Sequence, residues 1–269
     1  GPEQRTALML AVIHGHREIA RQLIDAGASL DETDSSGRTA LLYAMENRDV
    51  DTASRLVDAG ADRSVALPDG RTAAMFAMQM PATFAAKVIE DARLTVFDKH
   101  GRGLMWYAVN AGREDNVRLL LQRRPALAGQ GTGQGVGAYS ALHAAARLET
   151  PSILGTLLDA GAALDSVNDE GNTPLMIAAR AGREQNVAML IDRGAALDSQ
   201  DDLGNTALIL AAMSNQQGSV RRLLAAGADS DLRNSKREKA IHIAEQNDYA
   251  NIRALLEEHD SKGGFLKLF

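Results

Sequence analysis

The sequence contains no cysteine, few aromatic residues and no long apolar run. Without cysteine it has no disulfide, no thiolate metal site and no thiol nucleophile. Aromatic residues make up 4% of the 269 residues, too few for a platform on which nucleobases stack. No apolar run approaches the ~20 residues of a membrane-spanning helix. The net charge of −6 disfavours nucleic acid, because cations on the protein drive phosphate binding. We expect neither a nucleic-acid partner nor a membrane span.

The start of the chain leaves the compartment open. Gly1-Pro2 resembles the remnant of a cleaved tag, so an export signal is not excluded. We expect a soluble protein, with cytoplasm and periplasm undecided. The alanine-rich, cysteine-free composition suggests a bacterial source.

An internal repeat of 33 residues organises the chain. "RTALMLAVIHGHREIARQLIDAGA" aligns with "RTALLYAMENRDVDTASRLVDAGA", which places Thr6 on Thr39 and Gly27 on Gly60. The register points of the later repeats are Thr72, Gly103, Ser140, Thr173, Thr206 and Lys239. Such a period is the signature of a solenoid of stacked units.

Two columns of the repeat predict its packing. Alanine stands five residues after every register point: Ala11, Ala44, Ala77, Ala108, Ala145, Ala178, Ala211 and Ala244. A large aliphatic residue stands seventeen after it: Leu23, Leu56, Ile89, Leu120, Leu157, Leu190, Leu223 and Leu256. The alanines allow neighbouring helices to approach closely, and the aliphatic residues fill the space between stacked repeats.

We expect a single domain over residues 1–260, followed by an apolar tail over 261–269. The expected repeats span about 1–33, 34–66, 67–97, 98–130, 131–167, 168–200, 201–233 and 234–260.

Each repeat is predicted to form a helix, a turn, a second helix and a loop. In the sixth, Thr173 is a suitable N-cap and Pro174 fits the first helical position. Gly182 ends the first helix, and Gly194 closes the second in a left-handed cap.

The stretch "GNTPLMIAARAGREQNVAMLIDRGAALD" resembles the ankyrin repeat, whose pattern is G-x-T-P-L-H-x-A-A-x-x-G-H with a trailing G-A-D. The resemblance covers residues 4–260. It implies an all-α repeat solenoid of stacked helix-turn-helix units with β-hairpin or loop fingers. It also implies protein binding through the fingers and a concave groove, without catalysis and without a cofactor.

Repeats three and four depart from this pattern. Pro81 replaces the glycine between the helices, Gly103 replaces the capping threonine, and Trp106 replaces the family's histidine. Only His143 and His242 keep that histidine.

The glycine-rich stretch 129–138 raises the question of nucleotide binding, because its end fits G-x-G-x-x-A. A dinucleotide fingerprint needs a buried strand before it and a βαβ unit around it. A predicted helix precedes this stretch instead, and the stretch falls in the loop between repeats four and five. We interpret it as a flexible finger or as a loop that orders on a partner, with nucleotide binding as a distant alternative.

Arginine stands just before the register point in the first four repeats: Arg5, Arg38, Arg71 and Arg102. In the ankyrin family this position lies on the finger and faces partners. The column therefore predicts a docking strip for the carboxylates of an acidic patch. The alternative is a solvated stripe balanced by Asp34, Asp69 and Asp98.

Apolar and aromatic residues complete the predicted surface. Met80 is expected to point into the groove, whereas Met75 and Met78 lie on packed faces. The predicted partner contacts are Arg38, Arg71, Arg102, Met80, Trp106, Tyr107, Tyr139, Leu148 and Met213.

The tail "SKGGFLKLF" is predicted to hinge at Gly263-Gly264 and either to fold back over the last helix pair or to dock elsewhere. His14 and His16 lack a third ligand in the sequence, so we predict no metal site.

The sequence as a whole predicts a protein-binding scaffold, monomeric on its own and not an enzyme. We expect an inhibitor or immunity protein for one partner enzyme or toxin. The alternative is a general adaptor in a larger assembly.

Overall fold

The computed structural model describes residues 4–89, 94–129 and 140–266, the last five of these as backbone only. These residues form sixteen α-helices and the 3-10 helix η1 (Pro125–Gly129). The helices are α1 (Ala7–Ile13), α2 (Arg17–Asp25), α3 (Ala40–Glu46), α4 (Val50–Asp58), α5 (Ala73–Ala77), α6 (Ala82–Val88), α7 (Leu104–Asn110), α8 (Glu114–Arg123), α9 (Ala141–Ala146), α10 (Ser152–Asp159), α11 (Pro174–Arg180), α12 (Glu184–Asp192), α13 (Ala207–Met213), α14 (Gln217–Ala225), α15 (Ala240–Gln246) and α16 (Ala250–Leu266). None of the helices in these ranges is long and apolar enough to cross a membrane.

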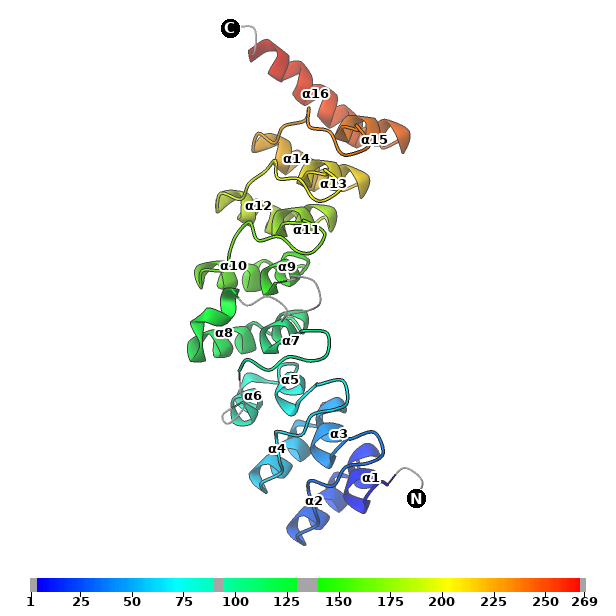
Figure 1. The fold of residues 1–269 in the computed structure, drawn as a ribbon, viewed down its shortest axis with the longest axis vertical. Helices are drawn as coiled ribbons and strands as arrows, with labels where there is room; N and C mark the ends of the chain where they lie inside the picture. The colour runs from blue at the N-terminus through cyan, green and yellow to red at the C-terminus, as the bar shows by residue number, and fades with distance from the viewer. Residues whose placement is uncertain (1–3, 90–93, 130–139, 267–269) are drawn as a thin grey trace. The chain divides into compact units, whose positions relative to one another are not determined.

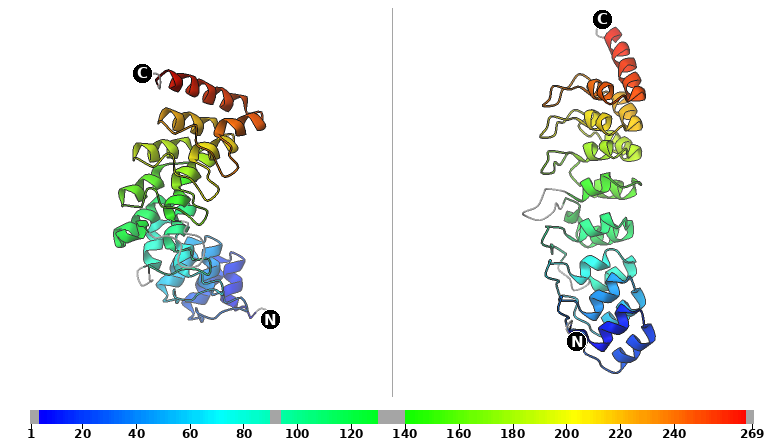
Figure 2. Two further views of the ribbon diagram at one scale, coloured as in Figure 1. Left: turned by 45° about the horizontal axis from the view of Figure 1, so that its top comes forward. Right: turned by 90° about the vertical axis from the view of Figure 1, so that its right-hand side faces the viewer.

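The chain divides into two compact units, residues 1–127 with 132–136 and residues 128–131 with 137–269. We call α1–α8 the N-terminal array and α9–α16 the C-terminal array. In both, each odd-numbered helix (an A helix) packs on the even-numbered helix that follows it (a B helix). Within an array, A helices stack on A helices and B helices on B helices (Figures 1 and 2). The predicted all-helical repeat fold is confirmed.

The two packing columns occupy the positions that the sequence predicts. Each of the eight alanines is at most 4% exposed. The aliphatic column is buried from Leu56 to Leu256, and only Leu23 in the first repeat is half-buried. Burial of a large aliphatic side chain contributes about 1.5–3 kcal/mol, so this column is a main source of stability between repeats.

Hydroxyl caps begin the regular A helices. The side chain of Thr206, for example, accepts from the N–H of Ile209 at 3.3 Å, and those of Thr6, Thr39, Ser140 and Thr173 act alike. The turn to the B helix is closed by a backbone bond, as from Arg183 N to Ala178 O at 3.0 Å.

Hydrogen-bonded turns form the fingers between repeats. Asp34 N donates to Arg38 O at 3.0 Å, and Asp34 Oδ1 accepts from the N–H groups of Ser36 and Arg38. The equivalent turns begin at Leu67, Asp98, Asn168, Asp201 and Asn234. The expected β-hairpins are not seen as strands in the described residues, where the pairing is limited to isolated bridges from Ala66 to Thr72 and from Phe97 to Gly103. The short side-chain-stabilised turns leave too few residues for longer ladders.

Two buried asparagines compensate for irregular turns. The B helices of repeats three and five begin at proline, which has no N–H to donate back to the A helix. In repeat three, Asn116 Nδ2 reaches across from the next repeat and donates to Met78 O at 2.9 Å and Met80 O at 2.8 Å. In repeat five, Asn186 Nδ2 donates in the same way to the carbonyls of Ala146 and Leu148.

The last helix differs from its prediction. Residues 263 and 264 lie inside α16, which runs unbroken to Leu266, so the expected hinge at the glycine pair is wrong. Each glycine costs about 1 kcal/mol in a helix relative to alanine, which lowers helix stability without forbidding the helix. Residues 267–269 and the tail side chains from residue 262 onward lie outside the described part.

Candidate protein-binding face

Each arginine of the predicted docking strip already has a carboxylate partner within the N-terminal array. The distances are 3.8 Å for Arg5–Asp34, 3.1 Å for Arg38–Glu46, 2.7 Å for Arg71–Asp69 and 2.7 Å for Arg102–Asp98. Two of the carboxylates are nearly inaccessible, with Asp34 and Asp98 exposing 2% and 0% of their side chains. An acidic partner would have to displace these internal partners, so the geometry favours the balanced stripe over the docking strip.

Aromatic rings hold the same arginines in place. The Arg71 guanidinium lies 5.0 Å from the centroid of the Phe76 ring. That of Arg102 lies 4.7 Å from Trp106 and 5.6 Å from Tyr107. Cation–π contacts of this kind contribute about 0.5–2 kcal/mol, so these arginines are anchored within the fold.

Two tyrosines complete Asp-Arg-Tyr clusters that the sequence analysis missed. Tyr107 OH donates to Asp98 Oδ2 at 2.7 Å, and Tyr43 OH donates to Asp34 in the same way. Burial disfavours the charged form of Asp98, but hydrogen bonds from Tyr107 and Arg102 outweigh it and lower its pKa. The available signal was positional, because each tyrosine stands nine residues after its aspartate in repeats two and four.

A varied column of side chains lines the carboxyl ends of the A helices. It stands seven residues after the register point and holds Ile13, Glu46, Gln79, Asn110, Arg147, Arg180, Met213 and Gln246. Ile13 and Gln79 are half-buried and the others are exposed. We call the surface that this column forms on each array the A face of that array. Its six residue types in eight positions contrast with the eight identical alanines two residues earlier.

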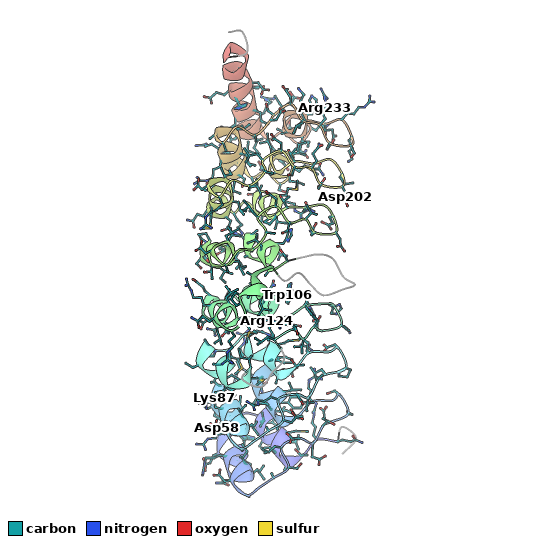
Figure 3. The ribbon with its side chains drawn as sticks, turned by 60° about the vertical axis from the view of Figure 1, so that its left-hand side comes forward. Asp58, Lys87, Trp106, Arg124, Asp202 and Arg233 are labelled. Atoms are coloured by element: carbon teal, nitrogen blue, oxygen red, sulfur yellow. The ribbon has the colours of Figure 1, made fainter. Side chains whose placement is uncertain are left out.

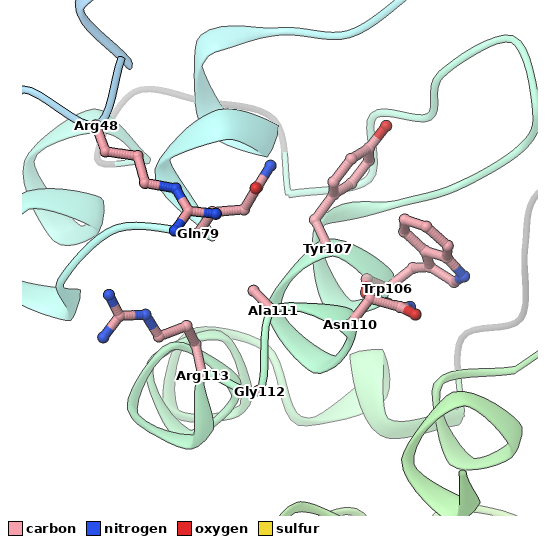
Figure 4. A pocket seen from close by; sticks show the side chains of 8 residues that line it. All are labelled: Arg48, Gln79, Trp106, Tyr107, Asn110, Ala111, Gly112 and Arg113. Carbon is pink, nitrogen blue, oxygen red and sulfur yellow. Dashed lines mark hydrogen bonds between the residues drawn. The ribbon is translucent and has the colours of Figure 1, made fainter. Parts of the chain in front are cut away.

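The A face of the N-terminal array contains a pocket of about 590 Å³. Its lining comes from repeats two to four: Arg48, Gln79, Trp106, Tyr107, Asn110, Ala111, Gly112 and Arg113. Figure 4 shows Arg48, Gln79 and Arg113 on one side of it and Trp106 with Asn110 on the other. Neither the Arg48 nor the Arg113 guanidinium makes an ion pair among the described residues. The volume lies within the ~300–1,000 Å³ typical of ligand pockets.

Comparison with known protein families identifies the family to which this repeat architecture belongs. The family model described as ankyrin repeats matches residues 1–65, 124–201, 142–234 and 194–264. These matches cover well over half of the sequence. The chain belongs to the ankyrin repeat family. Ankyrin repeats are generally protein–protein interaction scaffolds, typically without enzymatic activity. A search of curated proteins finds no match.

The ankyrin matches leave residues 66–123 uncovered. This interval contains Pro81, Gly103 and Trp106, at which the sequence departs from the ankyrin pattern, and six of the eight pocket residues lie in or next to repeat four. The irregular ankyrin repeats therefore supply most of the pocket.

Met80 does not lie where the ankyrin register predicted. It is 2% exposed, so its predicted place in the groove is wrong. The cause is the early end of α5 at Ala77 and the N-cap Pro81 of α6, since this tight turn carries Met80 into the core. Met75 and Met78 are fully buried, as expected.

The other predicted contacts differ in accessibility. Tyr107 is 7% exposed, and its hydroxyl is bonded internally. Trp106 and Leu148 are half-buried, and Met213 is 49% exposed. Tyr139 and nearly all of the glycine-rich stretch lie outside the described residues.

Charged residues lie on B helices and fingers of the ankyrin repeats. On the B helices of the N-terminal array, Lys87 Nζ lies 3.0 Å from Asp58 Oδ1 (Figure 3). In the C-terminal array, Asp202 and Arg233 lie exposed on successive fingers (Figure 3). Exposed ion pairs such as the first contribute about 0–1 kcal/mol.

Proposed function

We propose that this ankyrin chain is a scaffold that binds one dedicated partner protein, an enzyme or toxin, through its A face and inhibits it. The observation that supports the proposal is the contrast between the buried alanine column and the exposed column of the A face. The alanines that pack between repeats are identical, whereas the exposed column two positions later differs from repeat to repeat. A framework of fixed geometry that displays varied side chains in register is suited to recognition.

The physical advantage is preorganisation. The A face sits on the ends of packed helices, so little side-chain or backbone freedom is lost when a partner binds. Met213 adds an apolar group that is 49% exposed, and methionine adapts its shape to a partner. The varied polar residues of the column would then select among partners.

Affinity capture with the whole chain as bait, from its native source, tests the function. Inhibition predicts one main partner in a 1:1 complex, with loss of that partner's activity. The adaptor alternative predicts several unrelated partners whose activities persist. Nucleotide binding at residues 129–138 predicts instead that ATP or NAD raises the melting temperature of the chain.

A matched pair of variants tests the surface. Met213→Lys changes an exposed A-face residue of repeat seven, and Ala225→Lys changes an exposed residue on the B helix of the same repeat. We expect the first to weaken the captured complex at least tenfold and the second to leave it unchanged. Equal effects from both variants would remove the A face as the binding surface.

A further inference from the structure

The pocket in the N-terminal array carries an excess of positive charge. It is lined by Arg48 and Arg113 and by no acidic residue. The two carboxylates closest to Arg48 in sequence are engaged elsewhere, since Glu46 pairs with Arg38 at 3.1 Å and Asp49 pairs with Arg17 at 3.0 Å. The arginines of the finger column, by contrast, all have internal partners.

Arg48 occupies a backbone position that favours glycine. Its φ is +56°, and the equivalent residues Gly15, Gly112 and Gly182 have φ of +71°, +66° and +68°. The equivalent Asn215 and Asp248 have φ of +55° and +56°, but asparagine and aspartate adopt this conformation more readily than arginine. A side chain in this left-handed conformation costs roughly 1 kcal/mol or more relative to glycine. Its exposed side chain makes no hydrogen bond or ion pair within the described residues, so no polar contact there offsets this cost. Such strain is typical of functional positions.

The remaining walls of the pocket add an apolar surface and two amides. Trp106 is half-buried and packs edge-on against Tyr107, with ring centroids 5.1 Å apart. Asn110 Nδ2 donates to Trp106 O at 2.9 Å, which fixes the amide beside the indole. Gln79 lies across from them (Figure 4). The pocket thus offers two guanidinium groups on one side and an aromatic wall on the other.

We propose that this pocket receives an acidic segment of the partner protein, with its carboxylates held by Arg48 and Arg113 and an adjacent apolar side chain against Trp106. Guanidinium groups bind carboxylates bidentately and are easily desolvated, which suits them to this role. The inference rests on the proposed scaffold function and specifies its partner. An acidic peptide is favoured over nucleic acid because the chain as a whole has a net charge of −6, which repels a long polyanion.

A displayed library of random twelve-residue peptides, selected on the whole chain, provides the probe. We expect enriched peptides to combine at least two Asp or Glu residues with an apolar or aromatic residue. The test variant combines Arg48→Gly with Arg113→Gln, because the chain itself has Gly112 and Gln216 at these two register positions. It should therefore fold, and its melting temperature verifies this.

The control variant is Arg123→Gln, which removes an exposed arginine from the B helix α8 of the same array, outside the A face. We expect the double variant to lose at least tenfold in affinity for the selected acidic peptides and the control to lose less than twofold. Affinity should also fall with rising salt, as charge pairing requires.

Four results overturn the inference. The pocket is not the site for an acidic segment if the enriched peptides lack acidic residues. The same holds if acidic peptides bind the double variant as well as they bind the original chain. Both results leave the proposed scaffold function intact. Displacement of the peptide by single-stranded DNA at lower concentration than by unlabelled peptide assigns the pocket to nucleic acid. Failure to enrich any peptide, together with failure to capture a partner protein, overturns the scaffold function as well.

Discussion

Asn116 provides a sharp test of how the irregular repeats are held together. Its side chain is fully buried, and its Nδ2 donates to Met78 O and Met80 O at 2.9 and 2.8 Å. Neither carbonyl receives another hydrogen bond within the described residues. Asn116→Ala leaves both carbonyls buried without a donor.

The expected cost follows from these contacts. Each buried group left without a partner costs about 1–3 kcal/mol. Loss of Oδ1, which has no partner in the described part of the chain, offsets a fraction of this. We therefore expect Asn116→Ala to lower the free energy of unfolding by about 2–4 kcal/mol.

Urea unfolding followed by circular dichroism measures this, with Ser219→Ala as the control. Ser219 stands at the same register position, is fully buried, and its Oγ likewise has no partner among the described residues, so its loss should leave the free energy of unfolding unchanged or raise it. Asn116→Asp separates donation from volume, because a carboxylate of the same size faces the two carbonyl oxygens without a proton to donate. Asn116→Asp should therefore lower the free energy of unfolding more than Asn116→Ala does. If Asn116→Ala costs no more than Ser219→Ala, the reasoning is refuted.

Three further predictions concern stability. Ala178→Leu places a large side chain at a position with 0% exposure and should cost about 1–3 kcal/mol; an unchanged melting temperature would disprove the packing register. Tyr107→Phe removes the bond to the Asp98 carboxylate and should cost about 1.5–3 kcal/mol, measured in the same urea assay. Burial lowers the pKa of His143 below its ordinary 6.5, so the unfolded chain binds the proton more readily and stability should fall as pH drops below about 6.5; His143→Gln should flatten this dependence between pH 7.5 and 5.5, and an equal slope in both proteins would contradict it.

The regular part of the fold was predictable because it depends on local and repeated causes. An alanine in one register and a leucine in another specify how two helices approach, and the N-cap threonines and turn glycines mark where the helices begin and end. These packing and capping preferences act within one or two repeats, so the sequence alone was enough to predict them. The glycines at 263 and 264 misled because helix propensity is a weak preference that does not by itself end a helix.

The irregular turns were not predictable from the register. Met80 was assigned to the groove by counting from the alanine column, and that count assumes a helix of regular length. Pro81 shortens α5 and the turn draws Met80 inward. The compensating donor, Asn116, lies 36 residues from Met80 and 38 from Met78 in the chain. The clue to it was an asparagine, found again as Asn186, in a column that otherwise holds apolar or hydroxyl residues.

The candidate site shows why a repeated residue is a poor guide to binding in a repeat protein. The arginine before the register point recurs for an internal reason, because the same turn places a carboxylate beside it in repeats three and four. A residue that recurs together with an internal partner belongs to the framework. Arg48 instead has no second arginine in its column, and it occupies a left-handed backbone position where glycine costs less. Trp106 is the one tryptophan in a column that otherwise holds methionine, leucine, isoleucine or histidine. In a chain built from copies, a residue that violates the repeat at an energetic cost, with its side chain unpaired at the surface, is the stronger indication of a partner.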